Sequence, residues 1–209
     1  MTIWDKIFTN KKSSSSPWVT PSDRYLPALK QLIDESDFKI KHALDIGCGT
    51  GKHLKILQTA GFITDGIDSS RTAVALTQEL LGDDSNIVCA DMFKYDIPIG
   101  IYDLVISTLA IHHGTKTEIE NLVDRIYDAI AENGNIFITL PDFESNKKWI
   151  ADNNHEEIAH GMYIPLVGKE KGLTHSYFTQ QEIYKLFGRF NNLKLELDSD
   201  SNWVIKATK

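Results

Sequence analysis

The chain has 209 residues, with 22 Lys and Arg against 29 Asp and Glu, so its formal net charge is −7. A composition of 42% hydrophobic and 24% charged residues is typical of a globular domain that can bury one core without disulfides or metals. The acidic balance argues against non-specific nucleic-acid binding, because neutralising phosphates requires clustered Lys and Arg. The most apolar stretch, residues 104–111, is far shorter than the roughly 20 residues of a membrane helix.

The cysteines and the first residues of the chain indicate the cellular compartment in which the protein is expected. The two cysteines, Cys48 and Cys89, form no CxxC pair and belong to no Cys/His cluster with zinc spacing. Residues 1–6 carry charges where a signal peptide would need its apolar segment. We therefore expect a soluble, cytoplasmic, single-domain protein without a disulfide framework or a metal site.

The first part of the chain shows little regular pattern. Residues 1–21 are expected to be irregular, because Ser13 to Ser16 form a flexible link between Trp4 and Trp18. These two tryptophans either close over a ligand or simply anchor the segment. A helix is expected from residue 22, where apolar side chains begin to recur at helical spacing.

From residue 42 onward, strand and helix patterns alternate. We expect strands at 43–46, 62–67, 86–90, 102–107 and 135–140, and helices at 52–60, 71–81 and 117–131. Because the strand cores are almost continuously apolar, they predict a parallel sheet covered by helices on both faces.

The pattern changes after Pro141. Residues 144–175 are polar and mixed, and no regular element is predicted there. Thr179 and Glu182 then form a capping-box pattern for a helix that ends at Phe187. Two further strands are expected at 193–197 and 203–207, joined by the turn at 198–202.

The most informative segment is a glycine loop at residues 44–51, which reads L-D-I-G-C-G-T-G between a strand and a helix. Glycines allow the backbone to turn sharply and to approach a nucleotide closely. The dinucleotide pattern G-x-G-x-x-G fails at Lys52, and no G-K-[ST] follows that would complete a phosphate-binding P-loop. Asp45 at the mouth of the loop would repel a pyrophosphate but would suit a ligand that carries an ammonium group.

Three carboxylates end three consecutive predicted strands: Asp45, Asp68 and Asp91. Asp68 follows Gly51 by 17 residues, the place for a contact with a ribose diol. Asp91 could accept a hydrogen bond from an adenine amino group, while Met92 and Phe93 pack on the ring. Each acid alone could equally cap a helix or turn. Three of them at one edge of a sheet favour a ligand crevice.

These motifs carry a resemblance that covers about residues 40–142. Segments 43–51, 66–70, 90–93, 102–113 and 133–141 resemble, in order and spacing, class I S-adenosylmethionine-dependent methyltransferases. The resemblance implies an α/β fold with a doubly wound, mostly parallel seven-stranded sheet and an antiparallel strand beside the fifth. Residues 1–209 would then form one domain, with an N-terminal arm and helix (1–39), a cofactor core (40–142), and a lid that completes the sheet (143–209).

By the same resemblance the cofactor is S-adenosyl-L-methionine, and the product is S-adenosyl-L-homocysteine. The 47–51 backbone would hold the methionine part near Asp45, Asp68 would bind the ribose, and Asp91 with Met92 would contact the adenine. The expected cofactor contacts are Asp45, Gly47, Cys48, Gly49, Gly51, Asp68, Ser69, Asp91, Met92 and Ser107.

The methyl acceptor is expected at the end of the fourth strand, residues 107–114. This segment lacks the [DNS]-P-P-[YFW] motif of DNA amine methylation, and it has no acid near 107–109 for a catechol-type magnesium site. His112 and His113 are the nearest titratable groups, and they are either catalytic or structural. Trp18, Tyr163, His175 and Tyr177 are expected substrate contacts, or else ordinary core residues.

The short chain and its net charge of −7 favour a small-molecule acceptor over nucleic acid or a membrane. Two alternatives remain open at this point: a nicotinamide-dependent oxidoreductase on a similar sheet, and a non-catalytic cofactor-binding protein. The acceptor atom and the oligomeric state are not indicated by the sequence.

Overall fold

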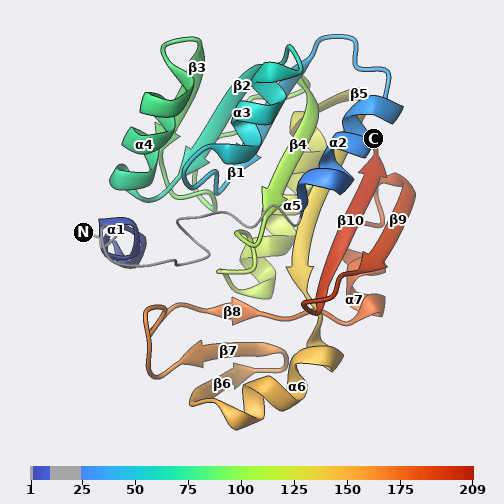
Figure 1. Ribbon diagram of the computed structural model, residues 1–209. Helices are drawn as coiled ribbons and strands as arrows, with labels where there is room; N and C mark the ends of the chain where they lie inside the picture. Colours follow the sequence, from blue (N-terminus) through green and yellow to red (C-terminus); the bar gives the residue numbers. More distant parts are fainter. Residues whose placement is uncertain (1, 10–24) are drawn as a thin grey trace.

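The computed structural model describes residues 2–9 and 25–209, and a seven-stranded sheet forms its centre (Figure 1). The sheet order is β3-β2-β1-β4-β5-β10-β9, in which β10 runs antiparallel to both of its neighbours while β3, β2, β1, β4 and β5 are parallel. The strands are β1 (His42–Ile46), β2 (Ile63–Asp68), β3 (Ser85–Cys89), β4 (Tyr102–Thr108), β5 (Ile130–Pro141), β9 (Asn191–Leu197) and β10 (Asn202–Thr208). The predicted doubly wound sheet, with an antiparallel strand beside the fifth, is confirmed.

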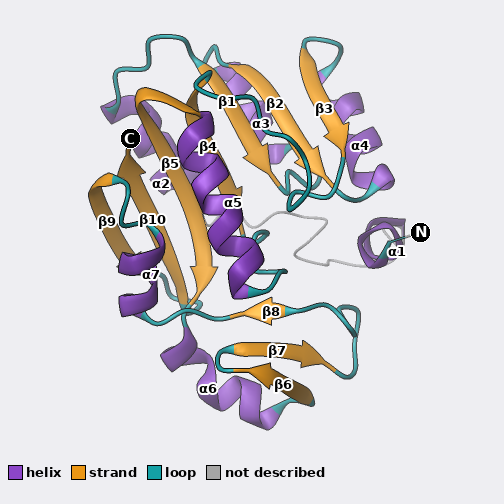
Figure 2. Ribbon diagram, turned by 180° about the vertical axis from the view of Figure 1, so that it is seen from behind, coloured by secondary structure: helices purple, strands orange, loops and turns teal. Residues whose placement is uncertain are grey.

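Helices cover both faces of this sheet. One face carries α2 (Leu26–Glu35), α3 (Lys52–Thr59) and α4 (Arg71–Leu81), and the other carries α5 (Lys116–Ala129) and α7 (Gln180–Leu186) (Figures 1 and 2). On the central strand β4, Leu104 and Ile106 belong to one apolar core, while Val105 between them belongs to the other. Since successive strand residues point to opposite faces, a strand covered on both sides must be apolar almost throughout.

The strand β5 begins earlier than the sequence analysis predicted. Ile130 already pairs with Tyr102, and the regular pairing resumes at Asn135 opposite Leu104. Asn133 lies between them with a φ of 63°, a left-handed conformation that asparagine tolerates. The apolar residues at 130–131 were read as the end of the preceding helix, because a short apolar run fits either element.

The sequence analysis assigned no helix or strand to the polar segment 144–175, but the structure has regular elements there. The segment contains most of α6 (Phe143–Asp152) and the strands β6 (His155–Ala159) and β7 (Met162–Pro165), and β8 (His175–Ser176) completes a second, antiparallel sheet. Figures 1 and 2 show this unit beyond the end of the main sheet at which β4 and β5 finish. The strand β6 is largely exposed and has no alternating pattern, so nothing in its sequence signalled a strand.

The prediction that residues 1–21 are irregular is wrong for α1 (Ile3–Thr9), a helix that packs beside α4. Thr2 and Asp5 cap its first turn, since each backbone N–H donates to the other's side-chain oxygen, at 3.0 and 2.9 Å. Ser70 Oγ, at the start of α4, donates a hydrogen bond of 2.9 Å to Asp5 Oδ1. A helix of seven residues therefore depends on this tertiary contact.

Two further points concern the described residues 2–9 and 25–209. No helix in these ranges combines the length and the apolar character needed to cross a membrane. The serine link and Trp18 lie outside the described residues.

Helix α5 offers a test of the local stability of this fold. Thr115 Oγ1 accepts a hydrogen bond from Glu118 N (3.2 Å), and Glu118 Oε2 accepts one from Thr115 N (2.8 Å). Because Thr115→Ala removes the cap, we expect the free energy of unfolding to fall by about 1 kcal/mol in urea denaturation. Thr117→Ala, an exposed change in the same helical turn, should alter it by less than about 0.5 kcal/mol. Equal changes in the two variants would contradict the capping assignment.

Candidate functional site

A cavity of about 530 Å³ lies at the carboxyl ends of the parallel strands, with α1 as one of its walls. Its lining includes eight residues that the sequence analysis selected: Gly47, Cys48, Gly49, Asp68, Ser69, Asp91, Met92 and His113. The structure therefore brings the loop after β1 together with the ends of β2, β3 and β4. This edge of a doubly wound sheet is where ligands are expected.

The glycine loop is shaped by close packing on two sides. Gly47, Gly49 and Gly51 have φ values of 76°, 54° and 77°, a region that favours glycine. A Cβ on Gly47 would lie 2.3 Å from Ala110 Cβ, and one on Gly51 would lie 2.6 Å from Thr77 Cγ2. A Cβ on Gly49 would meet only Phe8 Cζ, at 3.7 Å, across the cavity wall. A Cβ would therefore clash at Gly47 and Gly51, whereas at Gly49 it would make only an ordinary van der Waals contact.

Asp68 holds this loop and also lines the cavity. Its Oδ2 accepts a hydrogen bond from Gly49 N (2.9 Å), and its Oδ1 accepts one from Ser70 N (2.8 Å). Burial raises the pKa of this carboxyl, and the two N–H donors oppose that shift. Ser70, rather than Asp68, caps α4 by accepting from Ala73 N. Each oxygen of an ionised carboxylate accepts more than one hydrogen bond, so Asp68 retains capacity for a ligand hydroxyl.

The loop after β3 is held by a residue that the sequence did not indicate. Arg125 on α5 donates hydrogen bonds to the carbonyl oxygens of Met92 and Phe93, both 3.0 Å, and of Tyr95, 2.6 Å. Asp91 Oδ1 accepts from Phe93 N at 3.0 Å, which tightens the same turn. Both Met92 and Phe93 line the cavity, so Arg125 positions part of the cavity wall from outside it.

Three residues predicted as cofactor contacts are absent from the lining. Asp45, Gly51 and Ser107 lie behind the wall, and Ser107 Oγ donates to Ile46 O at 2.7 Å. Asp45 is 1% exposed, and its Oδ2 lies 4.0 Å from His53 Nδ1. Burial, with a contribution from Asp68, raises the pKa of Asp45 to about 8, and burial lowers the pKa of His53 to about 4. Burial therefore shifts each of the two groups toward its uncharged form.

The residues predicted around the acceptor separate into two groups. His113 lines the cavity beside Trp4, whose ring is 4.7 Å away, and His112 and His175 pack against His113 from behind. Tyr163 and Tyr177 instead pack with Phe143 in a small core under the second sheet. They do not line the cavity, and their role in substrate binding stays a prediction.

Several lining residues were not selected from the sequence, among them Phe8 on α1 and Lys52 and His53 in the first turn of α3. Trp4 and Phe93, for which the sequence offered a ligand contact, also line the cavity. The remaining lining residues at the end of β4 are Thr108, Leu109 and Ala110. Only their position in the sequence pointed to them, since they lie at the end of the strand that was expected to face the acceptor.

Comparisons with known proteins agree with this geometry. Residues 43–134 match the family model described as a methyltransferase domain. An uncharacterized methyltransferase of Bacillus cytotoxicus is 24% identical over 191 residues, covering 88% of this chain and 84% of the relative. Neither the oxidoreductase nor the non-catalytic alternative finds support in these matches.

The fold is shared with solved structures. A protein of Pyrococcus horikoshii OT3 superposes with a TM-score of 0.78 at 14% identity, covering 100% of this chain and 99% of that one. The 1,6-didemethyltoxoflavin-N1-methyltransferase of Burkholderia thailandensis superposes with a TM-score of 0.69 at 15% identity, covering 99% and 87%. Residues 43–134 thus match a methyltransferase domain, the Bacillus relative is named a methyltransferase, and the chain shares the fold of S-adenosylmethionine-dependent methyltransferases.

Proposed function

We propose that this protein transfers a methyl group from S-adenosylmethionine to a small molecule in the cytoplasm. The observation that carries the proposal is the cavity, onto which the glycine loop, Asp68 and the loop at Asp91 all face. Two free cysteines, one of them exposed, support a reducing compartment. Residues 1–39, 40–142 and 143–209 would serve as arm, cofactor core and lid of one domain.

The cavity suits the cofactor in three places. The glycine loop at Gly47 and Gly49, which lines the cavity, would lie against the methionine part, and the remaining acceptor capacity of Asp68 would bind the ribose hydroxyls. Asp91 and the adjacent Met92 would contact the adenine. Asp45, Gly51 and Ser107, which the resemblance implied as contacts, would support this surface from behind.

The cofactor supplies an activated methyl group. A lone pair of the acceptor forms the new bond to the methyl carbon while the carbon–sulfur bond breaks, and any acceptor proton is released. The chain has to align the acceptor with that bond and exclude water. Trp4, Phe8 and Phe93 give the cavity apolar rings for this purpose. Of the predicted catalytic pair, His113 would contact the acceptor, and His112 would hold the His113 ring in position.

Three observations support a small molecule as the acceptor. The net charge is −7, and the cavity volume lies within the range of small-ligand sites. The Burkholderia enzyme with the same fold bears the name of a small heteroaromatic substrate. Neither a nucleic acid nor a membrane is required as a partner.

Binding of the reaction product tests the cofactor site. We expect S-adenosylhomocysteine to bind the full chain in calorimetry, and Asp68→Asn to weaken it about 10- to 100-fold, since charge-assisted hydrogen bonds to the ribose are lost. Asp83→Asn, an exposed change after α4, should bind as the unmodified protein does. Absence of binding to the unmodified protein, or full affinity in Asp68→Asn, would refute the assignment.

The acceptor class requires a transfer assay. The full chain would be incubated with methyl-labelled S-adenosylmethionine and either metabolite extracts, RNA or protein. We expect label in a small-molecule product that chromatography separates from S-adenosylmethionine, and much less of this product with Asp68→Asn. Label retained with RNA or protein instead would replace the small-molecule proposal.

Helix α1 should contribute to affinity as the cover of the cavity. Phe8 is buried and lies across from Gly49, so Phe8→Ala should weaken S-adenosylhomocysteine binding about tenfold through lost apolar contact. Lys6→Ala, exposed on the same helix, should leave the affinity within about twofold. Unchanged binding in Phe8→Ala would show that α1 packs against α4 without covering the ligand.

A further inference from the structure

Three imidazole rings meet behind the acceptor end of the cavity. His112 and His113 come from the loop after β4, and His175 comes from β8. Their ring centroids are 3.9 Å apart for His112 and His113, 4.7 Å for His113 and His175, and 5.6 Å for His112 and His175. One ring nitrogen from each residue lies within 4.8 Å of the other two.

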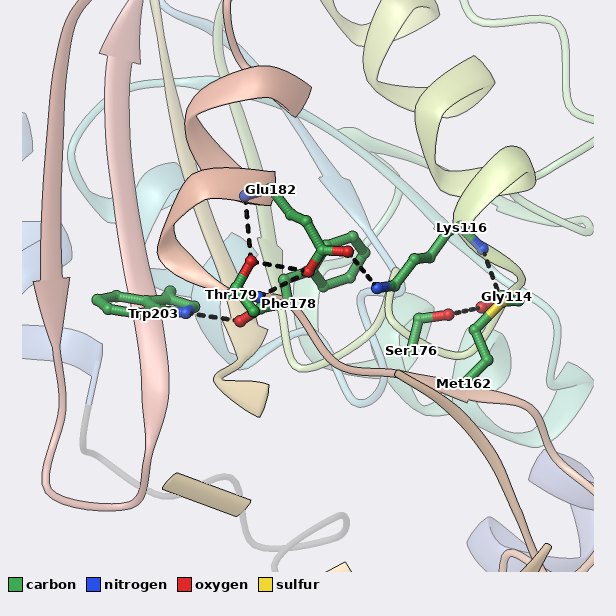
Figure 3. Close-up of polar contacts among 8 residues, drawn as sticks. All are labelled: Gly114, Lys116, Met162, Ser176, Phe178, Thr179, Glu182 and Trp203. Carbon is green, nitrogen blue, oxygen red and sulfur yellow. Dashed lines mark hydrogen bonds and ion pairs between the residues drawn. The ribbon is translucent and has the colours of Figure 1, made fainter. Parts of the chain in front are cut away.

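Backbone and side-chain hydrogen bonds hold β8 against this loop. Ser176 N donates to His112 O (2.9 Å), and Ser176 Oγ donates to Gly114 O (2.6 Å). Figure 3 shows the Ser176–Gly114 bond together with the bond from Lys116 N to Met162 Sδ, which ties α5 to the neighbouring strand β7. The position of His175 beside the other two rings is therefore determined by the fold.

Several nitrogens of these rings are buried without a hydrogen-bond partner. They are His112 Nδ1 and both ring nitrogens of His113, whereas His175 Nε2 has an ion-pair contact with Glu170. His112 and His175 are 7% and 5% exposed, so water has little access to replace the missing hydrogen bonds. Burying a polar atom without a partner is costly, and each such atom in a native structure calls for an explanation.

Imidazole nitrogens are common metal ligands, and an acidic side chain lies beside these three rings. Glu170 Oε2 lies 3.3 Å from His175 Nε2, which brings a carboxylate to the same cluster.

We propose that His112, His113 and His175 bind a divalent transition-metal ion such as Zn²⁺, with Glu170 supplying negative charge beside it. Imidazole suits zinc, iron, nickel and copper, and three protein ligands with one open position are typical of catalytic zinc sites. Nitrogens around a tetrahedral zinc are about 3.3 Å apart, and in this structure the three lie within 4.8 Å of one another, so the rings would have to move closer to bind the ion.

The position of the site beside the acceptor end of the cavity indicates what the ion would do in the reaction. His113 is the ligand that lines the cavity, so the open position would border the space proposed for the acceptor. An ion there would lower the pKa of an acceptor hydroxyl or thiol, and His113 would act as its ligand rather than as a base. This role rests on the proposed methyl transfer, whereas metal binding itself does not.

The binding test uses the full chain after chelator treatment, titrated with Zn²⁺ by calorimetry. We expect one ion per chain, and an affinity at least about 100-fold lower in His175→Ala and in His112→Gln. His160→Ala, an exposed histidine in the same part of the chain, is the matched control and should bind as the unmodified protein does. No stoichiometric binding, or an equal loss in His160→Ala, would overturn the proposal.

A second measurement does not depend on how the variants fold. X-ray absorption of the zinc-loaded, unmodified protein should show imidazole nitrogens at about 2.0–2.1 Å, and sulfur ligands from Cys48 or Cys89 would overturn the site. Asp68→Asn should retain Zn²⁺ while losing S-adenosylhomocysteine. The two proposals can therefore fail separately.

Discussion

The parallel register of the central strands is the constraint on which the site depends. Asp45 pairs with Gly66 and Ile106, and Asp68 pairs with Cys89, so the carboxyl ends of β1, β2, β3 and β4 reach one edge of the sheet. The register of each buried strand is fixed, because a slip of one residue would turn its apolar side chains to the opposite face of the sheet. The loops that leave this edge must then carry the groups that meet a ligand.

This dependence explains which parts could be predicted from the sequence. Gly47, Gly49, Asp68 and Asp91 were found because strand ends follow from apolar runs and glycines, and the sheet brings such ends together. Helix α1 could not be found in this way, since Asp5 is bonded to Ser70, more than sixty residues away. The second sheet was missed for the same reason: β8 has two residues, and its partners are distant in sequence.

The histidines illustrate the difference between finding residues and finding a site. The sequence indicated His112 and His113 at the acceptor end and His175 in a separate segment, with different roles for each. Only the contact of Ser176 with the 112–114 loop places the three rings together. A search for metal ligands by their spacing in the sequence would not find the proposed site, because its histidines come from two distant segments.

Two sets of buried titratable groups lie close to the cavity. They differ in how the free-energy cost of burying them is offset. Asp45 and His53 are neighbours at 4.0 Å, and burial shifts each of them toward its uncharged form. The three histidines have several unpartnered nitrogens and one nearby carboxylate, that of Glu170. The proposed metal ion would give one nitrogen of each ring a partner at once. It would also join the lid that supplies His175 to the strand end that supplies His113.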